Sequence, residues 1–270
     1  MSRHSEEILI LAKTYPTPSS RYRETTCVAG LTGDGNLRRI FPIPYRLISP
    51  DSQFKRWEWI RAIVSTTSKD QRPESRRIDV DTIDLLGKRI GTEHGWFERL
   101  QLLGPHVVDS FFELEERRKR TGATLGIIRP TAIVELQITP AKEPDWTEDD
   151  LEKLMQDGLF DTQEMKERIV LKKIPFDFYY RYISGESVYR HKITDWEAGM
   201  LYLHCVRNHG SDWENSFRDK FEVQFRNKDL LFLMGTIHRF PDQWLIVGVI
   251  YPPRRRPESE SPQLDLGLGL

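Results

Sequence analysis

Aromatic, acidic and cationic side chains crowd together in the stretch FDFYYRY, from Phe176 to Tyr182. In a β-strand successive side chains point to opposite faces, which separates the even-numbered aromatic residues from Asp177, Tyr179 and Arg181. A tyrosine beside an arginine on an exposed face can stack on a base and contact a phosphate of a single strand. We therefore predict Tyr179 and Arg181 as nucleic-acid-binding residues. The alternative is a half-buried strand with ordinary polar groups on one face.

The N-terminal part of the chain carries excess positive charge among aromatic residues. From Lys13 to Arg61 there are nine Lys or Arg residues against four Asp or Glu residues. From Ala141 to Lys166 the balance reverses, with three basic residues against nine acidic ones. This asymmetry indicates faces of opposite sign, and a basic face with interleaved aromatic rings suits a single-stranded nucleic acid. An ordinary solvated face is the alternative.

The segment GTIHRFPDQW, from Gly235 to Trp244, is a third candidate. It places His238 and Arg239 in a loop between two apolar strands. Loops held by a rigid scaffold often carry function, so we predict both residues to contact nucleic acid.

Clustered acids raise the possibility of an enzyme. TDWE (residues 194–197) and SDWE (residues 211–214) each place Glu three residues after Ser or Thr, which is typical of a capping box at a helix start. We therefore assign both to capping. An enzyme acting on nucleic acid or nucleotides stays open as an alternative, with Asp177, Glu186 and Asp195 as its first candidate acids, although we favour a protein without catalytic activity.

The spacing of histidine and cysteine does not favour a metal site. His204 and His209 are five residues apart, which separates their rings around a helix, and Cys205 between them has no second cluster to complete four ligands. The chain also lacks the common nucleophile, zinc-protease and dinucleotide motifs. We predict neither a metal nor a cofactor.

Composition bounds the class of protein. The 270 residues are 38% hydrophobic and have a formal net charge of -1, which allows a sizeable core and argues against a strongly basic nucleic-acid binder. The two cysteines lie in apolar stretches, which favours free thiols in a reducing compartment. No signal peptide or membrane-spanning run is evident, so we expect a cytoplasmic protein with no membrane partner.

The pattern of elements predicts an α+β fold. Short strands with a hairpin turn come first, then helices, then strands, helices and strands again, which is not the βαβ alternation. Val107, Phe111 and Leu114 have helical spacing before Gly122, and Thr147 starts an acidic helix. Pro130 predicts an edge or a bulge in a strand.

The segment KTYPTPSSRYRETTCVAGLTGDGNLRRIFPIPYR (residues 13–46) resembles the dual OB-fold-containing domain family. The features shared are a Lys-Thr strand, a Cys-x-x-Gly strand, a glycine turn and an Arg-x-x-Pro segment, and the resemblance covers about the first 65 residues of the chain. Members are suspected nucleic-acid binders that accompany mobile-element or defence genes. The resemblance implies OB-like barrels, which bind strands across an open face. It brings no catalytic residues.

Together these observations predict two small OB-like β-barrels with helical insertions and a disordered C-terminal tail. The expected parts are an N-terminal domain at 1–140, a C-terminal domain at 141–251 and a tail at 252–270. The residues predicted to bind nucleic acid in the first barrel are Lys13, Tyr15, Arg38, Arg39, Tyr45 and Arg46.

The tail ends in QLDLGL (residues 263–268), which resembles the peptide that binds the bacterial sliding clamp. Pro252 to Pro262 would serve as a tether, because an extended peptide held away from the body can dock on a partner. We predict a nucleic-acid-binding adaptor, acting on DNA or RNA, whose tail binds the clamp. For the whole chain, the alternative hypothesis is a protein-interaction module. For the tail, the alternative is a C-terminus that binds no partner. The predicted partner-binding residues are Gln263, Leu264, Leu266 and Leu268.

Overall fold

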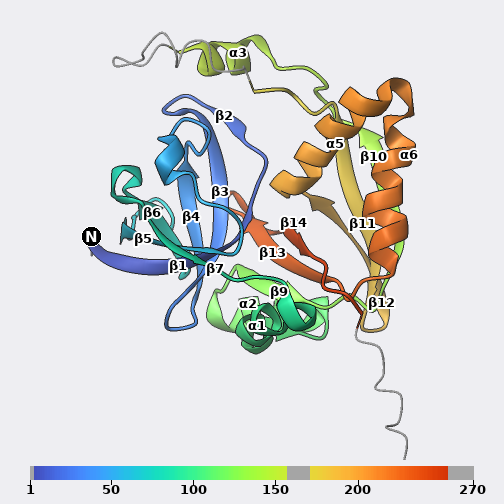
Figure 1. Ribbon diagram of the computed structural model, residues 1–270, viewed down its shortest axis with the longest axis horizontal. Helices are drawn as coiled ribbons and strands as arrows, with labels where there is room; N and C mark the ends of the chain where they lie inside the picture. Colours follow the sequence, from blue (N-terminus) through green and yellow to red (C-terminus); the bar gives the residue numbers. More distant parts are fainter. Residues whose placement is uncertain (1–2, 157–170, 255–270) are drawn as a thin grey trace, which may run out of the picture.

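The computed structural model describes residues 3–156 and 171–254. Within these residues the strands form two seven-stranded sheets, one from each half of the chain. Figure 1 shows the N-terminal sheet in blue to teal and the C-terminal sheet in green to red, with helices packed beside the second. The predicted mixed α+β class is confirmed. The predicted partner-binding residues Gln263, Leu264, Leu266 and Leu268 lie outside the described residues.

The first sheet closes into a five-stranded barrel. The order is β1-β3-β4-β6-β5, and β5 pairs back with β1 to complete the ring. The β4–β6 pairing is parallel, and the other pairings of the ring are antiparallel. The strands of this sheet are β1 (Arg3–Lys13), β2 (Thr17–Ser19), β3 (Arg23–Thr32), β4 (Leu37–Ile43), β5 (Glu58–Ser65), β6 (Ser75–Ile78) and β7 (Asp84–Arg89).

The second sheet repeats this order of strands. From β10 onward the order is β10-β11-β12-β14-β13, and β12 pairs parallel with β14. The strand that would correspond to β1 is interrupted at Pro130 and forms two strands, β9 and β10. Strand β9 pairs with β13, and β10 pairs with β11. Pro130 was expected at an edge or a bulge within a strand, and it lies instead between the two strands. The strands are β8 (Val107–Val108), β9 (Leu125–Ile128), β10 (Ala132–Pro140), β11 (Phe176–Ser184), β12 (Ser187–Ile193), β13 (Leu231–Ile237) and β14 (Phe240–Ile250).

Strand β1 shows why the two halves pack together. Its run ILIL (residues 8–11) is apolar at every position because both faces of the strand are buried. A strand with one solvent-exposed face would instead alternate apolar and polar residues. Ile8 and Ile10 lie in the core of the barrel, whereas Leu9 and Leu11 pack in a second core with residues of β9, β13 and β14. The halves therefore share a hydrophobic interface.

Helices fill the connections between strands. The connection from β12 to β13 carries four helical segments, which bury an aromatic cluster against the second sheet that includes Phe178, Tyr202 and Phe217. The helical segments are α1 (Glu93–Leu103), α2 (Phe111–Thr121), α3 (Glu148–Met155), α5 (Trp196–His209), α6 (Trp213–Arg218), the π-helical η5 (Asp219–Gln224) and the 3-10 turns η1 (Pro50–Ser52), η2 (Val80–Thr82), η3 (Gly104–His106) and η4 (Gly210–Asp212). None of the described helices is long and apolar enough to span a membrane.

Several local predictions can be compared with these elements. Thr147 caps α3 by accepting a hydrogen bond from the Asp150 amide, as predicted. The helix expected from Val107 begins later, because Val107 and Val108 pair with β9 and Ser110 caps α2. The predicted domain boundary at residue 140 does not coincide with the division between the sheets, which falls between β7 and β8.

Candidate nucleic-acid interface

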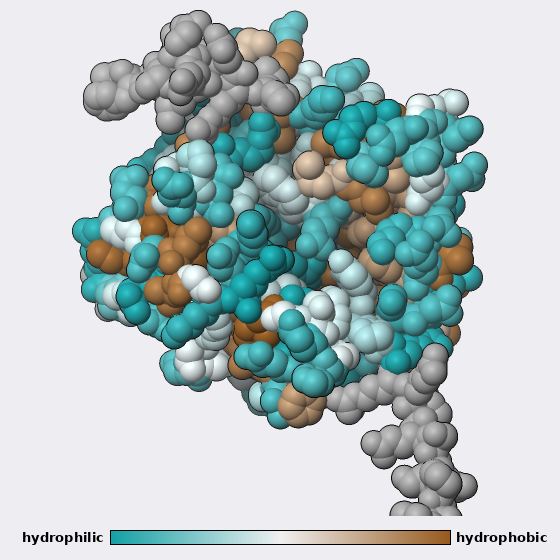
Figure 2. All heavy atoms as spheres, viewed as in Figure 1, coloured by the Kyte–Doolittle hydropathy of each residue, from teal (hydrophilic) through white to brown (hydrophobic). Residues whose placement is uncertain are grey.

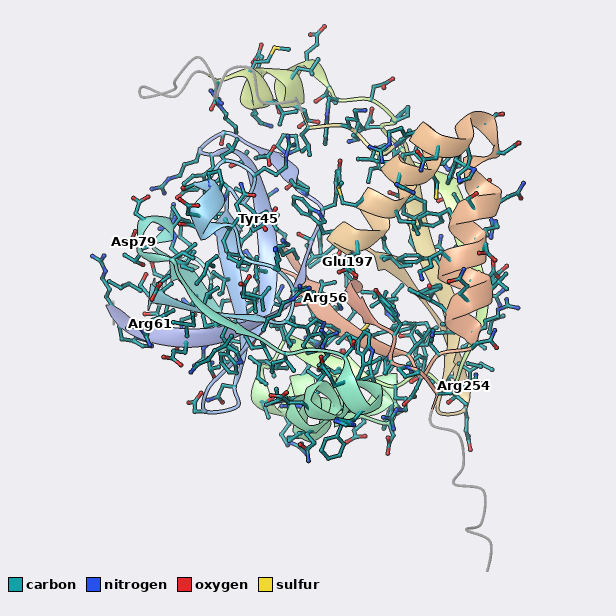
Figure 3. All side chains as sticks on the ribbon, in the orientation of Figure 1. Tyr45, Arg56, Arg61, Asp79, Glu197 and Arg254 are labelled. Atoms are coloured by element: carbon teal, nitrogen blue, oxygen red, sulfur yellow. The ribbon has the colours of Figure 1, made fainter. Side chains whose placement is uncertain are left out.

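A cleft of about 860 Å³ lies between the first barrel and the helices of the second half. Figure 3 shows Tyr45 on the side of the barrel that faces α5, and Arg56 close to Glu197 at the start of α5. Figure 2 shows mostly polar side chains on this side of the molecule, with smaller apolar patches and a hollow between the barrel and α5. The cleft is lined, among other residues, by Tyr15, Tyr45, Arg46, Lys172, Trp196, Met200, His204, Arg207, Lys220, Phe225 and Tyr251.

Aromatic rings from both halves form the wall of the cleft. The Trp196 ring lies 6.1 Å from the Tyr15 ring and 5.5 Å from the Tyr45 ring, centroid to centroid. The Tyr15 hydroxyl donates a hydrogen bond of 2.8 Å to the Lys172 carbonyl. Tyr251 stacks on Phe225 at 4.7 Å. Tyr15, Trp196 and Tyr251 are only partly buried, which leaves ring surface on which a base can stack. The Tyr251 ring also lies 5.4 Å from the Trp96 ring, centroid to centroid.

Lys13 packs behind this wall. Its ammonium lies 3.6 Å from the centroid of the Tyr45 ring and 5.3 Å from that of the Trp196 ring, and it donates to the Phe54 carbonyl. Burial lowers the pKa of Lys13 to about 8. The lysine therefore holds the aromatic wall by cation–π contact, and it is not among the residues that line the cleft.

Cations stand at the rim of the cleft. Lys172 and Arg207 are exposed and Lys220 is partly exposed. Arg207 donates to the His204 ring and Lys220 to the Gln224 side chain, and none of the three forms an ion pair with a carboxylate in the described part of the chain. Arg46, the fourth cation, pairs with Glu24 at 3.1 Å. Lys172, Arg207 and Lys220 can therefore meet phosphates without first breaking a strong internal pair.

The charged floor of the cleft is structural. Arg56 donates to the Leu11 carbonyl at 2.6 Å, the Val249 carbonyl at 2.9 Å and the Glu197 carboxylate at 2.8 Å, which ties the barrel to β14 and α5. Asp195 accepts hydrogen bonds from the Glu197 and Val249 amides, and burial raises the pKa of its carboxyl to about 6.

The two predicted capping boxes need correction. Asp195, not Thr194, caps α5, because the Thr194 hydroxyl donates to the Ile246 carbonyl instead. The segment from Ser211 forms part of the turn η4, and α6 begins at Trp213 without a side-chain cap. Glu214 pairs with Arg218 one turn later.

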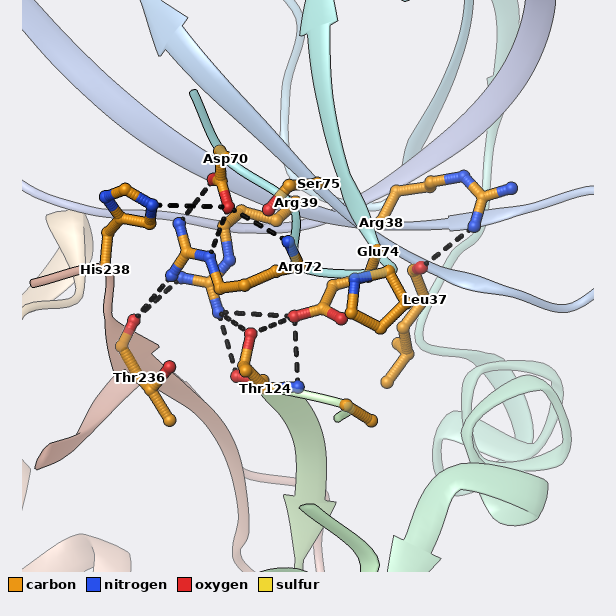
Figure 4. Close-up of polar contacts among 12 residues, drawn as sticks. Leu37, Arg38, Arg39, Asp70, Arg72, Glu74, Ser75, Thr124, Thr236 and His238 are labelled. Carbon is orange, nitrogen blue, oxygen red and sulfur yellow. Dashed lines mark hydrogen bonds and ion pairs between the residues drawn. The ribbon is translucent and has the colours of Figure 1, made fainter. Parts of the chain in front are cut away.

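Arg39 departs from its predicted role. It is only 4% exposed and lies in a polar junction between the halves (Figure 4), where it donates to the Thr236 carbonyl at 3.0 Å and the Thr124 carbonyl at 2.8 Å. Arg72 donates to the same Thr236 carbonyl, and Glu74 lies 3.7 Å from Arg39. Because β4 alternates its faces, Arg39 points outward from the barrel, and at this position the outward side meets the second half and not solvent.

Arg38 and the residues of the predicted loop lie apart from the cleft lining. Arg38 forms a two-pronged ion pair with Glu6, through Nε and Nη2. His238 stands at the edge of the polar junction, 3.8 Å from Asp70, and Arg239 is exposed in the turn from β13 to β14. These three residues do not join the cleft.

The strand FDFYYRY alternates as predicted. Phe178, Tyr180 and Tyr182 are buried, and Tyr179 and Arg181 lie on the opposite face. On that face the Arg190 guanidinium covers the Tyr179 ring at 3.5 Å. Arg181 pairs with Glu135 at 2.6 Å, and Lys192 pairs with Asp177 at 2.6 Å. The cations here are largely satisfied within the sheet, which makes this face a weaker site than the cleft.

The acids considered for an enzyme are not brought together. Asp177 lies toward the open end of the β11–β12 hairpin, and Glu186 lies in its turn. Asp195 is buried as a helix cap. Among the described residues no three His, Cys, Asp or Glu side chains are placed to hold a metal, and Cys205 is buried in the core.

The sequence reasoning missed Trp196, Lys172, Arg207 and Lys220. Trp196, Met200, His204 and Arg207 follow one another at helical spacing on α5, which marks a single face that could have been noticed. The contact of that face with Tyr15 and Tyr45 depends on how the two halves pack.

The geometry defines a two-part α+β protein with a closed barrel and an aromatic, cationic cleft between its halves. The chain belongs to the family described as Domain of unknown function (DUF8757), which matches residues 107–266. A second family, Domain of unknown function (DUF8758), matches residues 4–105. The two matches divide the chain close to the division between the two sheets.

No curated protein matches the chain. One similar solved structure is titled "Structure and Conformational Change of a Replication Protein A Heterotrimer Bound to ssDNA". The identity is 8% and the TM-score 0.27, with 93% of this chain and 66% of that chain covered. The chain thus spans just under two thirds of the length of that solved chain.

Proposed function

We propose that this protein is a nucleic-acid-binding adaptor that holds a single strand in the cleft between its halves. The observation that supports this most is the convergence of three partly exposed rings, Tyr15, Trp196 and Tyr251, with the cations at the rim. Rings that stack on any base and cations that contact phosphates are the two components of sequence-tolerant strand binding.

The order of strands supports an OB-like architecture for both halves. In the first half the ring closes when β1 pairs with both β3 and β5. In the second half the broken strand β9–β10 takes the place of β1, since β9 pairs with β13 and β10 with β11. We therefore treat the second sheet as a second OB-like unit whose first strand is interrupted at Pro130. Such barrels are common carriers of oligonucleotide sites.

Binding at the cleft should depend on rings and on rim charge together. Stacking on an aromatic side chain contributes about 1–3 kcal/mol per base, and each phosphate neutralised makes the affinity more sensitive to salt. The near-neutral net charge of the whole chain does not oppose this, because Lys and Arg outnumber Asp and Glu in the lining of the cleft, where Arg46, Lys172, Arg207 and Lys220 stand against Asp195 and Glu197.

The test is a fluorescence-anisotropy titration with labelled single-stranded DNA and RNA at low and moderate salt. We expect saturable binding that weakens with salt, and a loss of about tenfold or more for Lys172→Glu with Arg207→Glu. Lys69→Glu with Lys88→Glu is the matched control, since both lysines are exposed and lie outside the cleft. Absence of binding to either nucleic acid at low salt would refute the proposal and favour a protein-interaction module.

The tail is a separate part of the proposal. Its sequence from Gln263 to Leu268 would carry a sliding clamp or a similar partner to the bound strand. A labelled peptide of residues 258–270 should bind a bacterial sliding clamp saturably, and Gln263→Ala and Leu266→Ala should each weaken it. Equal binding by wild-type and variant peptides would rule this out.

A further inference from the structure

A second groove, of about 770 Å³, borders the cleft at the end of the helical connection to β13. We infer that a phosphodiester strand seated in the cleft continues into this basic groove, so that the ligand is a strand and not a single nucleotide. This inference rests on the proposed function and names the class of ligand that the two surfaces would share.

The basic groove is predominantly cationic. Its charged residues are four cations, Arg129, Arg226, Lys228 and Arg254, and two acids, Asp109 and Asp229. The cations come from the bend before β10, the end of the helical connection and the segment that follows β14. Groups from three parts of the chain thus converge on one hollow with excess positive charge.

The cations keep donors available for phosphates. Lys228 has no hydrogen bond or ion pair from its side chain within residues 3–156 and 171–254. Arg226 donates through Nη2 to the Val134 carbonyl at 2.7 Å and to the Glu222 carboxylate at 2.8 Å, which partly neutralises it. Arg254 donates one nitrogen to the Arg226 carbonyl at 2.8 Å. A guanidinium has five N–H donors, so each arginine is oriented by the backbone and can still bind an anion. Arg129 is partly neutralised by Asp229 at 3.3 Å.

The groove adjoins the cleft through one shared wall. Phe225 lines both hollows, and Tyr251, which lines the cleft, stacks on it. Lys220 lies 5.9 Å from the centroids of both rings, on the cleft side. Tyr251 and Arg254 are three residues apart along a segment that pairs with residues 228 and 229, so the two surfaces lie about 10 Å apart along the chain.

The two surfaces differ in what they offer a strand. The cleft has partly exposed rings, whereas Phe225, the aromatic residue that lines the groove, is 1% exposed. The groove therefore provides charge without stacking, which suits backbone phosphates and not bases. A mononucleotide that stacks in the cleft would leave the groove empty.

The experiment compares labelled single strands of about 5 and about 20 nucleotides, lengths that bracket the site of one OB fold. Wild type should bind the longer strand at least about tenfold more tightly, with a steeper salt dependence. Lys228→Glu with Arg254→Glu should remove most of that advantage and leave the short strand nearly unaffected. The control is again Lys69→Glu with Lys88→Glu, and melting curves confirm folding.

The outcomes separate this inference from the proposed function. Equal affinity for both lengths, or a long-strand affinity unchanged in the groove variant, overturns the inference while cleft binding stands. If wild type binds neither strand at low salt, the proposed function and this inference both fail.

Discussion

At the scale of single residues, the same side-chain type has different roles according to burial. Arg39 links the halves through backbone carbonyls, Arg56 ties three elements together under the cleft, and Arg207 stands at the rim without a carboxylate partner among the described residues. The arginines of this chain thus include both buried residues that hold elements together and exposed residues that can contact a ligand. Their assignment depends on which strand face meets the second half.

Arg39→Ala should destabilise the protein strongly. The change leaves the buried carbonyls of Thr124 and Thr236 with fewer donors and leaves Glu74, also buried, without its nearby cation. We expect a loss of about 3 kcal/mol in the free energy of unfolding. Denaturant titration measures it, with the exposed Arg239→Ala as control at about 0.5 kcal/mol or less. Similar small losses of unfolding free energy in both variants would contradict the role of Arg39 in holding the two halves together.

At the scale of elements, the helix α5 provides the cleft with one wall and part of its floor. Its buried cap Asp195 lies beside Arg56, and the helix then presents Trp196 and Arg207 on one face. The cap orients the start of the helix toward the barrel. Its position therefore affects every contact between Trp196 and the two tyrosines.

The cap should make stability depend on pH. Burial raises the pKa of Asp195 from its ordinary 3.8 to about 6, so the folded chain binds this proton more tightly than the unfolded chain does. The contribution is favourable below about pH 4 and is lost as pH rises to about 6. Asn at position 195 can still cap the helix but does not titrate. As the pH rises from about 4 to about 6, the unfolding free energy of wild type should therefore fall by about 2 kcal/mol relative to that of Asp195→Asn.

Denaturant titrations of both proteins at several pH values give the comparison. Groups other than Asp195 contribute to both profiles and cancel in the difference. A difference between wild type and Asp195→Asn that stays constant from about pH 4 to about pH 6 would show that the carboxyl titrates as an ordinary one.

The elements were largely predictable, because local patterns determine them. The alternation of FDFYYRY, the cap at Thr147 and the end of α2 at Gly122 follow from side-chain spacing and backbone preference. The start of α2 was misplaced because Val107 and Val108 are apolar in either a strand or a helix. These two residues form a strand because they pair with β9, which lies farther along the chain.

At the scale of the whole molecule, the site arises from packing between distant segments. Tyr15 and Tyr45 were predicted from an N-terminal pattern, but Trp196 joins them only because the second half packs against the barrel. The same packing buries Arg39, which no local pattern distinguishes from Arg38. The sequence therefore indicated some of the aromatic and basic residues of the candidate site, while the set of residues that line the cleft depends on the contact between the halves.

Photo-cross-linking of a bound single strand tests the central claim most directly. An oligonucleotide that carries 5-iodouracil at each position in turn is irradiated on the protein, and the linked residues are found by mass spectrometry. We predict cross-links at Trp196, Tyr15 or Tyr251, the partly exposed rings of the cleft. Cross-links confined to Tyr179 on the outer face of β11, with none in the cleft, would contradict binding between the halves.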